Sequence, residues 1–246
     1  RGRRPDGEPA IDCEEGASGR APKHIRAMSE VEFNNAYKLG SVLAHSVHPG
    51  MSLYFARRLS DQLGVVVKVR EKQASFGKPG EKGDLSPKET QWRSSMTLLL
   101  NTPKSDVVCE LHEVIETSRN YYVVMESIRG QDLFETATKD RVGHAEAREI
   151  IRQILVGLQL LHGAGQMHKD LKMENVMVSR REPGGGGPTA VRAKLIDFDT
   201  VESWQPGAPR ASEVLGTDGY IAPEAYLGEY SPAVDIYCAG VIMYKL

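Results

Sequence analysis

Two stretches in the second half of the sequence combine acids, an amide and lysines at short spacing. Residues 168–175 (HKDLKMEN) hold an aspartate, a lysine and an asparagine directly after an amphipathic pattern, and residues 195–199 (LIDFD) add two aspartates. Lys68 stands alone in an apolar run, where a buried lysine is unfavourable unless it is paired. Carboxylate and amide oxygens hold Mg²⁺, lysines neutralise phosphate charge, and a carboxylate accepts a hydroxyl proton. The set therefore predicts phosphoryl-transfer chemistry.

The composition places these residues in a folded protein. The chain has 246 residues, of which 40% are hydrophobic, and its net charge of −2 gives no electrostatic reason to expect nucleic acid as a partner. Cys13, Cys109 and Cys238 lie far apart, which favours a reducing compartment; we expect the cytoplasm, with the nucleus as an alternative. No apolar run approaches the roughly 18–20 residues of a membrane span.

The first half of the chain predicts a small, mainly antiparallel lobe. Residues 1–34 mix charged residues, glycine and proline, so we expect them to form a flexible tail. A loop is expected over residues 74–88, and a helix from Pro87 to near Asn101. Short strands are expected over residues 37–43, 53–58, 63–69, 107–115 and 121–126.

The second half is mostly helical in pattern. One helix face is expected to contain Ile150, Ile151, Ile154, Leu155, Leu158 and Leu161. Strands are expected near Val176 and over residues 194–196, with residues 182–189 lengthening the hairpin between them. A last helix, expected to start at Ser231-Pro232, is apolar on most sides and needs neighbours, so we expect the sequence to end inside a domain.

Five motifs in order resemble those of a eukaryotic protein kinase. HKDLKMEN is similar to the catalytic loop H-R-D-L-x-x-x-N, IDFD to D-F-G, and VVVK to V-A-I-K. GTDGYIAPE resembles the loop that ends in A-P-E, and Asp235 resembles the aspartate that braces the catalytic loop. The resemblance covers residues 37–246. It is nearest to serine/threonine kinases of the calcium/calmodulin-dependent and calcium-dependent groups.

The resemblance implies a two-lobed α+β protein-kinase-like fold. Residues 35–128 would form the N-lobe, and residues 129–246 a C-lobe truncated after its central helix. ATP and Mg²⁺ would bind between the lobes, and the γ-phosphate would go to serine or threonine hydroxyls of protein substrates. A regulatory segment or partner outside this chain is left open.

The resemblance also assigns roles to individual residues. Asp170 would be the catalytic base, Lys172 would steady the transferred phosphoryl group, and Lys68 would contact the α- and β-phosphates. Asn175 and Asp197 would bind Mg²⁺.

A second set would bind the nucleotide's adenosine. Met125 would be the gatekeeper, the stretch from Glu126 to Ile128 would meet the adenine, Asp132 would lie near the ribose, and Met177 would lie beneath the adenine.

Four positions depart from the family pattern. The glycine-rich loop is expected over residues 44–53, where only Gly50 remains, and side chains there hinder close approach to phosphates. Asp199 replaces the glycine of D-F-G, and an aspartate should narrow the range of backbone conformations at this position. Lys169 replaces an arginine, so we expect weaker dependence on activation-loop phosphorylation.

The helix glutamate that pairs with Lys68 is the fourth. Counting forward from Lys68 selects Glu89, whereas counting back from Pro103 selects Arg93. We expect Glu89 to pair with Lys68, although an exposed ion pair between Glu89 and Arg93 stays open.

Two other functions compete with a protein kinase. A pseudokinase scaffold is favoured by the poor glycine loop and opposed by the intact Lys68, Asp170, Asn175 and Asp197. A small-molecule or lipid kinase of related fold would not need the peptide-positioning GTDGYIAPE segment.

Overall fold

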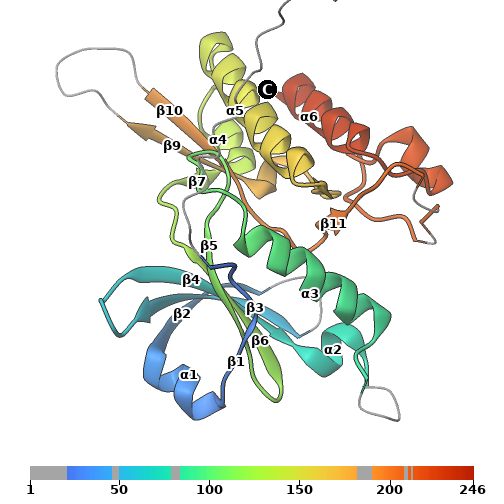
Figure 1. Cartoon of the computed structure of the whole chain (residues 1–246). Helices are drawn as coiled ribbons and strands as arrows, with labels where there is room; N and C mark the ends of the chain where they lie inside the picture. Colours follow the sequence, from blue (N-terminus) through green and yellow to red (C-terminus); the bar gives the residue numbers. More distant parts are fainter. Residues whose placement is uncertain (1–20, 46–49, 79–83, 182–189, 208–209, 212) are drawn as a thin grey trace, which may run out of the picture.

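The computed structural model describes residues 21–45, 50–78, 84–181, 190–207, 210–211 and 213–246. A part rich in strands lies below a part rich in helices, and the chain passes from one to the other after strand β6 (Asn120–Glu126) (Figure 1). The two-lobed α+β architecture expected from the sequence is confirmed.

The first lobe is built on a six-stranded sheet with the strand order β1-β5-β6-β4-β3-β2. Besides β6, its strands are β1 (Arg26–Ala27), β2 (Tyr37–His45), β3 (Met51–Arg58), β4 (Gly64–Glu71) and β5 (Leu111–Glu116). The neighbours from β5 to β2 are antiparallel, whereas β1 lies parallel to β5. All five predicted strands are present. Strand β5 begins later than predicted because the backbones of Val107 and Cys109 bond to Leu195 in the other lobe.

Helix α3 (Pro87–Leu100) lies across one face of this sheet, and its predicted range is confirmed (Figure 1). The Ser86 hydroxyl caps it by accepting a hydrogen bond from the backbone N–H of Glu89. The short helix α2 (Lys72–Phe76) corrects the start of the predicted loop. Its Phe76 ring packs against Trp92 of α3, with ring centroids 5.6 Å apart. This contact provides the apolar burial that a helix this short needs.

The expected flexible tail ends earlier than residue 34. Strand β1 is followed by helix α1 (Glu30–Ala36), which starts at a capping box between Ser29 and Glu32. Phe33 is fully buried on the sheet face opposite α3, and its ring stacks on Tyr122 at 3.7 Å between centroids. The buried aromatic contact makes α1 part of the lobe. Residues 1–20 lie outside the described residues.

The second lobe contains three α-helices, two short 3₁₀ helices and five short strands within the described ranges. The helices are α4 (Leu133–Lys139), α5 (His144–Gly163), α6 (Ala233–Lys245), η1 (Met173–Asn175) and η2 (Pro223–Leu227). The strands are β7 (Gln131–Asp132), β8 (Gln166–Met167), β9 (Val176–Arg181), β10 (Ala190–Leu195) and β11 (Glu202–Ser203).

 Helix α3 of the first lobe also contacts β11 of the second lobe.

The long helix α5 lies where its apolar pattern predicts it. Ile150, Ile154, Leu158 and Leu161 are buried, so this face is confirmed, whereas Leu155 is exposed because it lies at the edge of the apolar stripe. Strands β9 and β10 form the predicted hairpin, paired from Leu195↔Val176 to Ala190↔Arg181. The predicted insertion at residues 182–189 lies outside the described residues.

One hydrophobic core joins the two lobes. Trp92, Met96 and Leu99 of α3 belong to the same buried cluster as Leu158 of α5 and Phe198 of the loop after β10. This shared core packs α3, β5 and β6 of the first lobe against α5 and the loop after β10 in the second lobe. Among the described residues, no helix is both long and apolar enough to cross a membrane.

Candidate active site

Lys68 of β4 reaches two aspartates of the loop that follows β10. Its Nζ lies 2.6 Å from Asp197 Oδ1 and 2.6 Å from Asp199 Oδ2. Arg70, two residues farther along β4, places its guanidinium 3.0 Å from Asp199 Oδ1. Two cations thus face two carboxylates, and this balance is what allows Lys68 to remain buried at 5% exposure.

The charges of this cluster stabilise one another. Burial alone raises the pKa of Asp199, but the nearby Lys68 and Arg70 outweigh burial and lower its pKa to about 2. Burial likewise lowers the pKa of Lys68, and attraction to Asp199 and Asp197 reverses this and raises it above its ordinary value. Lys68 and Asp199 are therefore both charged at neutral pH.

The structure corrects the expected pairing of Lys68 with Glu89. The Glu89 carboxylate instead accepts a hydrogen bond of 2.6 Å from the hydroxyl of Tyr121 on β6. Arg93, the other candidate position, donates to the same hydroxyl at 2.7 Å and to Glu116 at 2.5 Å. Tyr121 thus hydrogen-bonds to both Glu89 and Arg93 of α3. The two carboxylates that contact Lys68 come from the other lobe.

Asp170 lies in a hydrogen-bonded group of three side chains. Its Oδ1 accepts from the Thr217 hydroxyl at 2.7 Å, and its Oδ2 lies 3.1 Å from Lys172 Nζ. Lys172 also donates to Thr217 at 2.8 Å. The arrangement orients a carboxylate beside a cation and a hydroxyl-bearing loop, which is suited to accepting a proton from a hydroxyl group.

The Asp235 side chain binds the backbone of the loop that contains Asp170. It is fully buried in α6 and accepts hydrogen bonds from the backbone N–H groups of His168 at 2.8 Å and Lys169 at 2.9 Å. Its Oδ2 also lies 2.8 Å from the ring of His162. The expected bracing by Asp235 therefore has a direct geometric basis, and it supports Lys169 in a left-handed conformation with φ of 66°.

Asn175 and Asp197 come together where β9 and β10 meet the loops. The backbone N–H of Ile196 donates to the Asn175 carbonyl at 3.0 Å, and the Asn175 amide donates to the Asp170 carbonyl at 2.8 Å. This leaves an amide oxygen and the accessible Asp197 carboxylate as hard oxygen donors.

These donors fit a magnesium ion that keeps water or phosphate ligands. Within the described ranges, no three His, Cys, Asp or Glu side chains converge as a metal site. An all-protein cage is therefore not what the described residues provide. A shared site with a phosphate-bearing ligand is consistent with their donor chemistry.

The residues expected around adenosine lie at the lobe junction. Asp132 and Met177 are direct register partners between β7 and β9, and Asp132 also caps α4 through the Glu135 N–H at 2.8 Å. The Glu126 carboxylate accepts from Lys194 and from the backbone N–H of Glu110.

The other residues expected around adenosine are Met125, Glu126 and Ile128, at and just after the end of β6. Glu126 is the last residue of β6, and its backbone N–H donates to the Glu110 carbonyl at 3.0 Å, so its backbone carbonyl is the group that an adenine would meet. Met125 and Ile128 are partly buried against the shared core. These residues therefore lie along one edge of the lobe junction.

Gly50 has a structural reason for its place in the expected glycine-rich loop. Its φ is +74°, and a β-carbon there would approach the Cβ of Ala74 to 2.5 Å. Its carbonyl accepts the backbone N–H of Glu71 at 2.8 Å. Gly50 thus starts β3 against the end of β4. Residues 46–49 lie outside the described residues, so the remainder of that loop stays a prediction.

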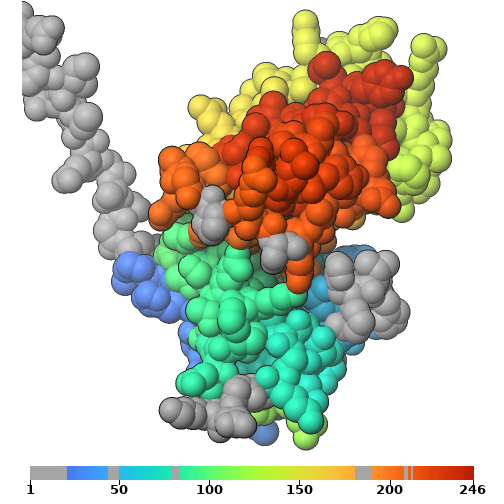
Figure 2. Space-filling view, turned by 90° about the vertical axis from the view of Figure 1, so that its right-hand side faces the viewer, coloured from blue at the N-terminus to red at the C-terminus, as the bar shows by residue number. Residues whose placement is uncertain are grey.

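Two ion pairs attach the segment after Asp199 to its surroundings. Lys169 donates to Glu202 of β11, and its Nζ lies 4.2 Å from the centroid of the Tyr230 ring. Lys88 at the start of α3 lies 3.0 Å from Glu213. Figure 2 shows the green surface of α3 directly below the orange segment that follows residue 200.

Sequence reasoning missed Arg70, Glu202 and the pairing of Asp199 with Lys68. Arg70 is two positions from Lys68 on a strand, so period-2 alternation places both on one face and was a usable signal. The contacts of Glu202 and Asp199 depend on the path of the loop after β10, which has no comparable periodicity.

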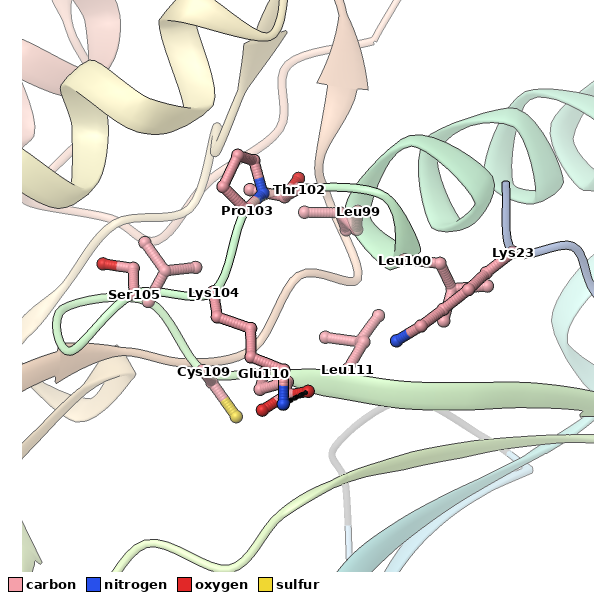
Figure 3. Close-up of a pocket in the computed structure, with 11 residues that line it drawn as sticks. Lys23, Leu99, Leu100, Thr102, Pro103, Lys104, Ser105, Cys109, Glu110 and Leu111 are labelled. Carbon is pink, nitrogen blue, oxygen red and sulfur yellow. Dashed lines mark ion pairs between the residues drawn. The ribbon is translucent and has the colours of Figure 1, made fainter. Parts of the chain in front are cut away.

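A small pocket lies away from these residues. It opens where α3 ends and β5 begins, between Lys23, Leu99 and Leu111 (Figure 3). Lys104 and Glu110 form an ion pair of 2.7 Å at its rim. It lies apart from the charged cluster of Lys68 and has no part in the chemistry proposed below.

Comparison with known proteins agrees with the motifs. The family model described as "Protein kinase domain" matches residues 58–246. Death-associated protein kinase dapk-1 of Caenorhabditis elegans is 36% identical over 141 residues, which is 56% of this chain and 9% of that protein. Calcium-dependent protein kinase 3 of Oryza sativa subsp. japonica is 32% identical over 63% of this chain and 27% of its own length. Calcium-dependent protein kinase 13 of Arabidopsis thaliana is 30% identical over 63% of this chain and 28% of its own length. The matched region thus spans less than a third of each of these relatives.

Proposed function

The chain belongs to the protein kinase family, and from this premise we propose that it transfers the γ-phosphate of ATP to serine or threonine hydroxyls of protein substrates. The observation that carries the proposal is the contact of Asp170 with both Lys172 and Thr217. This contact supports the proposal because a carboxylate suited to accepting a proton lies beside a cation and beside the segment that a peptide would meet.

The residues have separate tasks in this proposal. Asp170 accepts the proton of the attacking hydroxyl, and Lys172 offsets the negative charge of the transferred group. Lys68 binds the α- and β-phosphates, and Asn175 with Asp197 holds Mg²⁺. When bound, Mg²⁺ neutralises phosphate charge during transfer.

The same proposal covers the adenosine and the partners. Glu126, Ile128, Asp132 and Met177 contact the nucleotide, and the protein partner is a substrate with an accessible serine or threonine. The pairing of Lys172 with Thr217 supports serine/threonine selectivity. We further propose a reducing compartment, the cytoplasm or the nucleus, because Cys109 and Cys238 are buried free thiols.

The test measures nucleotide binding and phosphate transfer on the same sample. The full-length protein is titrated with Mg-ATP and then given a mixture of serine and threonine peptides. We expect binding and transfer, with Asp170→Asn lowering kcat on the order of 10²–10⁴-fold while ATP affinity changes little.

Three outcomes would contradict the proposal. Binding without transfer would favour a pseudokinase scaffold, and equal transfer by Asp170→Asn would remove Asp170 from the chemistry. Transfer to a lipid or small molecule in preference to peptides would overturn the substrate class.

A further inference from the structure

The partner of Lys68 comes from the second lobe rather than from α3. Asp199 directs its two carboxylate oxygens to different cations: Oδ2 lies 2.6 Å from Lys68 and Oδ1 lies 3.0 Å from Arg70. A carboxylate held at both oxygens has a fixed orientation. Asp199 therefore connects Lys68 and Arg70, and these three side chains are called the clamp.

Arg70 in turn is held by aromatic rings. Its guanidinium carbon lies 5.2 Å from the ring centroids of both Phe76 and Trp92. The contacts run from Trp92 on α3 through Arg70 and Asp199 to Lys68. These contacts thus join helices and strands of the first lobe to the loop after β10 in the second lobe.

Helix α3 is attached to the sheet without using Lys68. Arg93 and Lys72 both contact Glu116 of β5, and Tyr121 accepts from Arg93 while it donates to Glu89. This network fixes the helix through β5 and β6. Lys68 and α3 are therefore connected through Asp199, Arg70 and Trp92, and not through an ion pair between Lys68 and Glu89.

Charge balance shows why a second carboxylate is useful. In the structure Lys68 contacts both Asp197 and Asp199. Engagement of Asp197 with Mg²⁺ would remove one of these two partners from Lys68. Asp199 then remains as the carboxylate that keeps Lys68 in place, while Arg70 balances the charge of Asp199.

We propose that Asp199 is the positioning residue that holds Lys68 toward the nucleotide phosphates, in place of a glutamate from α3. The proposal rests on the proposed kinase function. Asp199 touches neither substrate nor Mg²⁺; it acts through Lys68.

The test compares two matched substitutions of carboxylates in the full chain. Asp199→Asn removes the charge that contacts Lys68, and Glu89→Gln removes the charge that contacts Tyr121. The dissociation constant of ATP is measured by titration without peptide, KM and kcat are measured with peptide, and thermal unfolding is followed for each variant.

We expect Asp199→Asn to weaken ATP binding and raise the KM for ATP about tenfold, which corresponds to one poorly oriented charged contact. Glu89→Gln should change both constants by less than about twofold even if its unfolding temperature falls. Asp199→Glu, which keeps the carboxylate, should bind ATP more tightly than Asp199→Asn. A purely structural role would lower the unfolding temperature of Asp199→Asn without moving the ATP constants.

Several results would overturn the inference. These are unchanged ATP binding in Asp199→Asn, tighter binding in Asp199→Asn, or an equal loss in Glu89→Gln. If Asp199→Asn does not fold, Arg70→Gln replaces it, because it frees one oxygen of the clamp; unchanged ATP affinity there overturns the inference.

The inference and the proposed function fail differently. If the unmodified protein binds ATP and transfers phosphate, but the Asp199 and Glu89 variants do not show the expected ATP constants, only the role of Asp199 is refuted. Absence of ATP binding in the unmodified protein refutes both.

Discussion

The hydroxyl of Thr217 donates a hydrogen bond of 2.7 Å to the carboxylate of Asp170, across 47 residues of sequence. Lys172 contacts both partners, so the loop that contains Asp170 and the segment that contains Thr217 are joined at the proposed proton acceptor. This contact makes the position of the peptide-facing segment depend on the catalytic loop, and it can be tested by substitution.

Thr217→Val should lower kcat about tenfold, because Asp170 loses a donor that orients it and Lys172 loses an acceptor. Thr217→Ser keeps the hydroxyl and should remain within about threefold of the unmodified protein. Steady-state transfer to a serine peptide measures both variants. Equal activity of the valine and serine variants would show that the hydroxyl does not orient Asp170.

Asp235→Asn should lower the free energy of unfolding by about 2–4 kcal/mol, because two buried backbone N–H groups lose their charged acceptor. Denaturant unfolding at neutral pH measures this change. Asp140→Asn, at an exposed pair with Arg180, is the matched control and should change the free energy by less than about 0.5 kcal/mol. A comparable small effect for both would mean that Asp235 does not support the loop.

Glu202→Gln should lower activity about tenfold, because it leaves the buried cation of Lys169 without its carboxylate. Glu213→Gln removes the exposed pair with Lys88 and should change activity less than about twofold.

Since Glu202 supplies the negative charge itself, phosphatase treatment of the unmodified protein should leave transfer nearly unchanged. Loss of activity on phosphatase treatment would show that a phosphate is required there.

The buried thiol of Cys109 should make stability fall at alkaline pH. Burial raises its pKa from 9.0 to about 12, so the folded protein keeps the proton that the unfolded chain loses. The contribution is fully present below about pH 9 and is lost as the pH rises toward 12. Denaturant midpoints measured across this range should decline, and Cys109→Ala should decline less steeply.

The reactivity of the thiols offers a separate check on the same burial. In a Cys13→Ser variant, native protein at about pH 8 should resist alkylation at Cys109 and Cys238, whose pKa values are both raised to about 12. Unfolded protein should react at both. Rapid alkylation of the native variant would contradict the buried positions.

Local sequence patterns determined the elements and much of the candidate site. The apolar stripe of α5 follows from 3.6-residue periodicity, and the start of α3 follows from Ser86 and Pro87. Asp170, Lys172 and Asn175 share one short loop, so their proximity needs no tertiary information. Motif order alone was enough to indicate the fold.

The partners of Lys68 were decided by the tertiary structure. Spacing along the sequence left Glu89 and Arg93 as alternatives one helical turn apart, and Tyr121 on β6 holds both. Asp199 reaches Lys68 across 131 residues, because the shared core contains Phe198, which precedes Asp199, and residues of β6, the strand that pairs with β4.

The folded start of the first lobe was decided in the same way. A sequence stretch rich in charges gives little sign that Phe33 will stack on Tyr122, which lies far along the chain. Local propensity acts between neighbours, whereas these contacts depend on loop paths and on the packing of two lobes. Motifs and periodicity therefore specify which groups are available, and only the packed chain specifies which of them meet.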